Sequence, residues 1–159
     1  MLLFKKIIFA VLLLISACGF SPIYTDQNSA EVAGKISIQE PSTQNEFIFY
    51  SQLINRFSEN GDKYILNYAI STSKEDRALN LDGSVHQIEI AGSVIFSLKD
   101  SKSGLEILSD KEEVYLSYSN FGSTAAVLNA ERATNKQLVV LLANKVADRL
   151  SFIIIEKGS

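Results

Sequence analysis

The sequence has few of the residues on which most catalytic and metal sites depend. Its 159 residues include one cysteine, one histidine, one methionine and no tryptophan. A single cysteine excludes an intramolecular disulfide framework. A single histidine, His86, argues against histidine-rich metal sites and against a Ser-His-Asp hydrolase. We therefore expect neither catalytic residues nor a metal site, and hence a protein that is not an enzyme.

The sequence also lacks an excess of positive charge. Lysine and arginine number 15 against 18 aspartate and glutamate residues, for a net charge of −3. Non-specific binding to nucleic acid needs a basic face, so we expect no nucleic-acid partner. The length and the mixed composition are those of one globular domain rather than of a disordered or fibrous chain.

The N-terminus has the pattern of a bacterial lipoprotein signal peptide. Lys5 and Lys6 precede an unbroken apolar run over 7–15, which is too short for a bilayer span of about 20 residues. Ile15-Ser-Ala-Cys18 then matches a lipobox. In a lipobox the cysteine thiol takes a diacylglycerol, and the amine freed by cleavage takes an N-acyl chain such as palmitate. The alternative is an ordinary secretory signal with a cysteine nearby by chance, but a free thiol is a liability in an oxidising compartment.

This pattern predicts the organisation of the chain and its location. We expect a cleaved signal peptide over 1–17, a lipidated N-terminus and tether over 18–34, and a single domain over 35–156. Two or more acyl chains anchor a protein stably to a membrane. Gly19 stands where aspartate usually signals retention in the inner membrane, so we expect a periplasm-facing anchor in the outer membrane. Apart from the lipid on Cys18, no cofactor is expected.

Hydrophobic periodicity predicts a strand and a helix in the first part of the domain. Residues 35–39 alternate as a short strand. Thr43-x-x-Glu46 is a capping-box pattern at the start of a helix of about three turns. Its predicted apolar face consists of Phe47, Tyr50, Ile54 and Phe57.

Three long strands and a second helix follow. The strands are predicted over 63–73, 85–99 and 105–119, with a turn at 100–104 between the last two. Gly92 in the middle of a strand indicates a bulge or bend. A helix over 124–155 is predicted from the spacing of Val139, Ala143, Val146, Leu150 and Ile153.

The order β-α-β-β-β-α predicts an α+β fold. Both helices carry an apolar stripe, so they must pack on one face of a four-stranded, mainly antiparallel sheet. The other face of the sheet is then polar and made of small residues, either solvated or in contact with a partner. Lys99, Lys102 and Lys111 lie around the predicted turn and are candidates for binding a phosphorylated glycolipid.

The two ends of the mature chain carry longer motifs. The first is Ala17-Cys-Gly-Phe-Ser-Pro-Ile-Tyr24. The second runs from Tyr118-Ser-Asn-Phe-Gly-Ser-Thr-Ala125 through Asn129-Ala-Glu-Arg-Ala133 to Val146-Ala-Asp-Arg-Leu150. Together with the order of elements, these motifs resemble the lipopolysaccharide-assembly lipoprotein family (LptE, also called RlpB), in the form found in alphaproteobacteria. Cys18 is the only matched residue to which the resemblance assigns a functional role.

The resemblance implies a fold and a partner. The family packs two helices on a four-stranded sheet, and its members sit largely inside the large outer-membrane β-barrel (LptD) that inserts lipopolysaccharide into the outer leaflet. They assist assembly of that barrel and loosen lipopolysaccharide as it arrives. Two alternatives stay open. One is an auxiliary lipoprotein of another envelope system, such as a lipid-transport ABC system or a secretin pilot. The other is a periplasmic hydrolase, although the spacing of the Ser, Asp and Glu residues indicates no catalytic site.

Overall fold

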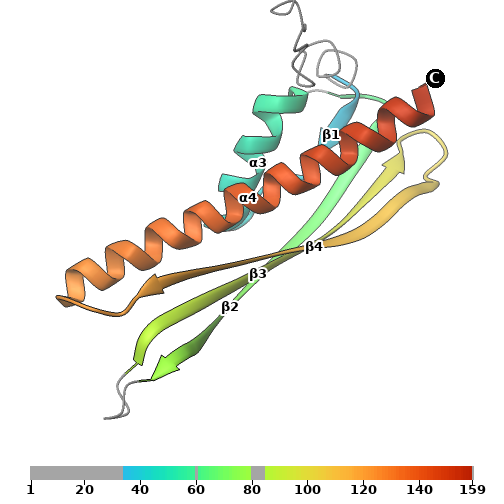
Figure 1. The fold of residues 1–159 in the computed structure, drawn as a ribbon. Helices are drawn as coiled ribbons and strands as arrows, with labels where there is room; N and C mark the ends of the chain where they lie inside the picture. Colours follow the sequence, from blue (N-terminus) through green and yellow to red (C-terminus); the bar gives the residue numbers. More distant parts are fainter. Residues whose placement is uncertain (1–33, 60, 80–84, 159) are drawn as a thin grey trace, which may run out of the picture.

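The structure is a computed structural model that describes residues 34–59, 61–79 and 85–158. The predicted signal peptide, Cys18 and nearly all of the predicted tether lie outside these residues. The elements follow the predicted order (Figure 1): β1 (Ile36–Ile38), α3 (Gln44–Phe57), β2 (Tyr64–Leu79), β3 (Val85–Asp100), β4 (Glu106–Ser119) and α4 (Thr124–Gly158).

The four strands form one mixed sheet in the order β1-β2-β3-β4. β1 pairs with β2 in parallel, with Ile36 opposite Tyr64, while β2, β3 and β4 form antiparallel pairs. Both helices lie on the same side of this sheet, and α4 runs along its length (Figure 1). The predicted α+β class and the mainly antiparallel sheet are therefore confirmed.

One face of each long strand and the inner faces of the helices form a single core. All of its buried members are hydrophobic among the described residues. In β3, alternate residues from Ile90 to Leu98 are buried, as the predicted period of two requires. On α4, Val139, Ala143, Val146 and Leu150 are buried as predicted, but in the last turn the buried residue is Ile154.

Helix α3 begins where the capping-box pattern predicts. The Thr43 hydroxyl accepts a hydrogen bond from the backbone N–H of Glu46, and the Glu46 carboxylate accepts one from the backbone N–H of Thr43, at 3.2 and 3.1 Å. Ser42 donates its hydroxyl and its N–H to the same carboxylate. These bonds, that of the Ser42 hydroxyl above all, lower the pKa of Glu46.

The prediction of the apolar face of α3 was wrong for its first residue, Phe47. Phe47 is 63% exposed, and the fully buried residues are Phe49, Leu53 and Phe57. These three recur every fourth residue, whereas Phe47 precedes Phe49 by two residues and therefore points about 200° away around the helix. The ring of Phe49 packs against that of Tyr68, with their centroids 4.8 Å apart.

The bulge expected at Gly92 is not present. Gly92 pairs in unbroken register with Thr72 and with Val114. Instead, α4 approaches the sheet closely at this point: a Cβ atom at position 92 would lie 2.1 Å from Leu138 Cδ2 and 3.2 Å from Leu142 Cδ1. Glycine fits here because its hydrogen leaves room for the buried side chains of Leu138 and Leu142, which a Cβ atom would displace.

Candidate interaction surface

The sheet face that points away from the helices is not covered by any described element. Alternation places every second residue of β2, β3 and β4 on this open face. Successive rows across β2, β3 and β4 are Asn67-Ser97-Ser109, Ala69-Ile95-Lys111, Ser71-Ser93-Glu113 and Ser73-Ala91-Tyr115. We refer to these twelve residues as the open face.

Small uncharged side chains dominate the β2 and β3 columns of the open face. The hydroxyls of Ser71 and Ser93 hydrogen bond to each other at 2.8 Å. Two shallow hollows lie on this face, one around Ser71, Ser93 and Tyr115 and the other around Ala69 and Ile95. Among the few large side chains, Ile95 and Tyr115 are 57% and 55% exposed. The arrangement allows another flat surface to approach the strands closely.

The charged residues of the open face are paired with one another along β4. Glu113 accepts hydrogen bonds from Lys111 Nζ at 2.5 Å and from the Tyr115 hydroxyl at 2.9 Å. The bond from Lys111, followed by that from Tyr115, lowers the pKa of Glu113, and Glu113 in turn raises the pKa of both partners. The neighbouring Glu112 points to the opposite side of the sheet, where Lys145 of α4 reaches it at 3.2 Å.

The three lysines predicted as glycolipid contacts do not converge on one point. Lys111 lies opposite Ile95, and Lys99 is four residues further along β3, about 13 Å away at the usual rise of a strand. Lys102 lies in the turn, where its backbone N–H donates to Asp100. Glycolipid binding by these residues stays a prediction, as does acylation of Cys18, which lies outside the described residues.

The long motifs at the C-terminal half supply contacts that hold α4 to the rest of the domain. Glu131 accepts hydrogen bonds from Lys74 Nζ on β2 and from the Tyr118 hydroxyl on β4, the latter at 3.3 Å. The bond from Lys74 is the main cause of a lowered pKa of Glu131. Tyr118 and Glu131 are motif residues, but sequence reasoning missed their contact and also missed Lys74, for which no local pattern gives a signal.

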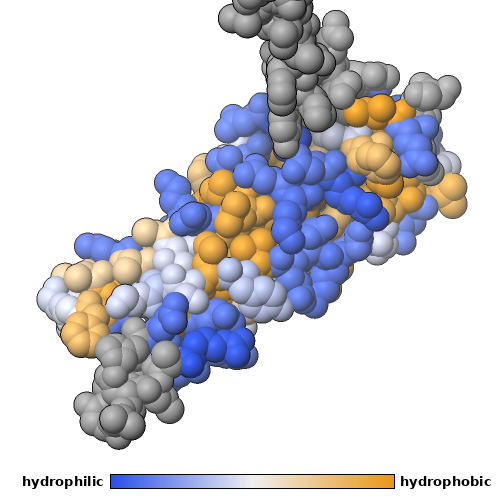
Figure 2. Space-filling view, viewed as in Figure 1, coloured by the Kyte–Doolittle hydropathy of each residue, from blue (hydrophilic) through white to orange (hydrophobic). Residues whose placement is uncertain are grey.

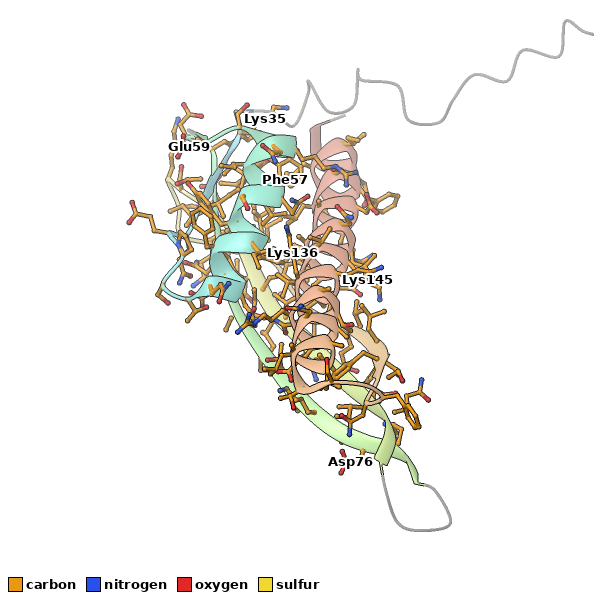
Figure 3. The ribbon with its side chains drawn as sticks, turned by 90° about the vertical axis from the view of Figure 1, so that its left-hand side faces the viewer. Lys35, Phe57, Glu59, Asp76, Lys136 and Lys145 are labelled. Carbon is orange, nitrogen blue, oxygen red and sulfur yellow. The ribbon has the colours of Figure 1, made fainter. Side chains whose placement is uncertain are left out.

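The last motif joins α4 to both α3 and β4. Asp148 accepts a hydrogen bond from Arg56 of α3 at 2.5 Å, and Arg149 donates to Asp110 of β4 at 3.2 Å. Figure 3 shows α3 and α4 side by side along much of α3. These two ion pairs hold α4 against α3 and β4.

In the described part of the chain, no helix is long and apolar enough to cross a membrane. No group of three or more His, Cys, Asp or Glu side chains within this part could hold a metal ion. The side chain of His86 is not among those described.

Comparisons with known proteins identify the fold. No protein-family model matches the sequence, and no curated protein matches it. A protein from Caulobacter crescentus CB15, described as a candidate lipoprotein, is similar with a TM-score of 0.64 at 19% identity, over 82% of this chain and 97% of that one. The rare lipoprotein B from Shewanella oneidensis is similar with a TM-score of 0.63 at 14% identity, over 79% of this chain and 98% of that one.

A third structure, the uncharacterized lipoprotein B from Nitrosomonas europaea, gives a TM-score of 0.61 at 13% identity over 75% of this chain and 83% of that one. At these identities the likeness concerns the fold. The chain therefore has the fold of the rare lipoprotein B structure, over nearly the whole length of that protein.

Proposed function

We propose that this chain is an outer-membrane lipoprotein of the lipopolysaccharide-assembly (LptE, RlpB) type. It is anchored by the diacylglycerol and the N-acyl chain on Cys18, and it is not an enzyme. It partners and plugs the large β-barrel that translocates lipopolysaccharide, assists the assembly of that barrel, and helps to insert lipopolysaccharide into the outer leaflet.

The fold shared with rare lipoprotein B is the observation that carries this proposal. The lipobox ending at Cys18 and the motif that follows it support the same function. The open face supports a protein partner, because a nearly flat sheet surface whose β2 and β3 columns carry no charge can pack against another protein without leaving charges unpaired on burial. Its β4 column is compatible with this contact, since Lys111, Glu113 and Tyr115 already satisfy one another.

Depletion of the protein in its own cells tests the proposal. We expect the amount of correctly assembled barrel to fall and the outer membrane to admit hydrophobic antibiotics. Wild-type protein should restore both, whereas Cys18→Ala should not, because it removes the acylated residue. The proposal is wrong if barrel levels and permeability are unchanged after depletion.

A further inference from the structure

The outer edge of β2 is paired over only a short part of its length. β2 has sixteen residues, and β1 pairs in parallel with three of them, from Tyr64 to Leu66. Beyond these, the side chain of Gln39 accepts a hydrogen bond from the N–H of Tyr68 at 3.4 Å. Figure 1 shows α3 and β1 beside the first part of β2, while no described element flanks the second part on that side. This edge of the sheet is therefore open from Ile70 onwards.

Alternate residues of β2 direct their main-chain groups to the outer edge. The N–H of Tyr64 donates to the carbonyl of Lys35 at 2.9 Å, and the carbonyl of Leu66 accepts from the N–H of Gln39 at 3.0 Å. The even-numbered residues of β2 thus direct their N–H and C=O groups outward, and the odd-numbered residues direct theirs to β3.

The same alternation leaves a row of unpaired groups further along the strand. The register of β2 with β3 is unbroken up to Asp76, so Ile70, Thr72 and Lys74 also direct their main-chain groups outward. We refer to these three residues as the β2 edge. No residue in the described ranges forms a hydrogen bond with their outward N–H and C=O groups. These groups repeat about every 7 Å along the strand.

The opposite edge of the sheet, formed by β4, is different. Its odd-numbered residues face outward in the middle of the strand, because the odd-numbered residues of β3 already bond to β2. The outward N–H of Lys111 donates to Asp110 Oδ1 at 2.8 Å, and the outward carbonyl of Glu113 accepts from Lys145 Nζ at 3.0 Å. Charged side chains on an edge oppose the addition of another strand. The middle of β4 is therefore protected, whereas the β2 edge is not.

The chemistry of the β2 edge selects an extended main chain as its ligand. A row of donors and acceptors with the spacing of a strand is satisfied as a set by another strand. Figure 2 shows mainly hydrophilic surface over this part of β2, at the lower margin of the view, so contact there depends on main-chain hydrogen bonds rather than on apolar burial. The neighbouring residues on the open face, Ser71 and Ser73, are small and would not obstruct a new strand.

The proposed partner restricts where such a strand can come from. Strands in the wall of a closed barrel are paired on both sides, so none of them has a free edge. A segment that leaves the wall, such as a loop that enters the barrel, has its main-chain groups available. The β2 edge adjoins the open face, so a segment of this kind can be added while the open face contacts the wall.

We propose that the β2 edge binds an extended segment of the barrel partner, from outside the strands of its wall, as a fifth strand of the sheet. The new strand lies beside β2 and follows β1 along the same edge. This inference rests on the proposed function and adds to it the conformation of the partner segment and the residues that hold it. Main-chain hydrogen bonds then hold the domain to its partner in addition to the packing of the open face.

Proline substitutions test strand addition without disturbing the existing sheet. Thr72→Pro removes an outward N–H and places the proline ring on the β2 edge, while the hydrogen bonds to β3 are made by the odd-numbered neighbours and are kept. Thr72→Ala keeps the N–H and changes only the side chain. Ser117→Pro is the matched control, because Ser117 is exposed and its N–H points outward from β4. Circular dichroism and urea unfolding verify that each variant folds.

Each tagged, acylated variant is produced in cells that retain the untagged protein and is purified from detergent-solubilised outer membranes. Thr72→Pro should lower the recovery of the barrel per mole of tagged protein by about tenfold, the equivalent of about 1.4 kcal/mol. The reason is that a blocked edge leaves donors and acceptors of the partner segment unpaired. Thr72→Ala and Ser117→Pro should recover as much barrel as the wild-type protein.

Photo-crosslinking gives a second measurement that does not depend on the folding of a proline variant. With p-benzoyl-phenylalanine in place of Thr72, we expect a crosslink to the barrel protein that maps outside its wall strands, and with the same residue in place of Ser117 we expect none to that segment.

Three results would overturn strand addition while the wild-type protein still recovers the barrel, and they would leave the proposed function intact. One is undiminished recovery with folded Thr72→Pro, and another is an equal loss with Thr72→Ala or Ser117→Pro. The third is a crosslink from position 72 to the wall strands, or no crosslink. Absence of the barrel from the wild-type purification would overturn both the inference and the proposed function.

Discussion

Replacing Gly92 by alanine should destabilise the domain because of one close approach. The new Cβ would lie 2.1 Å from Leu138 Cδ2, well inside the 3.5–4.0 Å separation at which carbon atoms attract each other. Leu138 is fully buried, and the equally buried Leu142 lies 3.2 Å from the same Cβ position, so Leu138 has little room to move. Overpacking of this kind costs about 1–3 kcal/mol. At an open strand position the same change would be neutral or stabilising.

Urea unfolding of the purified chain, followed by circular dichroism, measures this cost. Gly92→Ala should lower the urea midpoint without changing the slope. Ser97→Ala, on the open face of the same strand, is the control and should change stability by less than about 0.5 kcal/mol. In a Leu138→Ala background, where the clashing methyl groups are absent, Gly92→Ala should cost almost nothing. An unchanged midpoint for the single variant, or the same cost in both backgrounds, would refute the reasoning.

Three further predictions concern hydrogen-bonded and titrating groups. Thr43→Ala removes the acceptor for the Glu46 N–H and should lower the free energy of unfolding by about 1 kcal/mol in the same urea assay. The pKa of Glu131 is lowered in the folded protein, so its stabilising effect is present above the pKa of the unfolded state, near 4.5, and is lost as the pH falls through the folded pKa. Glu131→Gln should therefore flatten the acid side of a plot of melting temperature against pH. An unchanged profile would contradict this. Burial raises the pKa of Tyr68 to about 12, so wild-type stability should fall between pH 10 and 12, and Tyr68→Phe should reduce that fall.

Local patterns in the sequence were sufficient to predict most of the fold. The alternation in β3 identified which residues are buried, and Thr43 with Glu46 located the start of α3. The same alternation predicted an uncovered polar sheet face, because the residues between the buried ones are small. These features depend on neighbours within a few positions, which is the information that periodicity contains.

The errors arose where residues distant in sequence meet. Gly92 was interpreted as a bulge because nothing near it in the sequence reveals that Leu138 packs against it. Phe47 was assigned to the core because the apolar residues near the start of this helix fit more than one helical spacing. Only the position of the sheet decides which set of them is buried. Likewise, Lys74 could not be matched to Glu131, since fifty-seven residues separate them.

Affinity purification of the tagged, acylated protein from detergent-solubilised outer membranes tests the proposed partnership most directly. Wild-type protein should bring down a very large β-barrel protein in stoichiometric amount, identified by mass spectrometry. Ser93→Arg, at the centre of the open face, should reduce its recovery, whereas Ala133→Arg on the exposed side of α4 should not. Recovery of transporter subunits or of a secretin in place of the barrel, or of no partner from wild-type protein, would contradict the account.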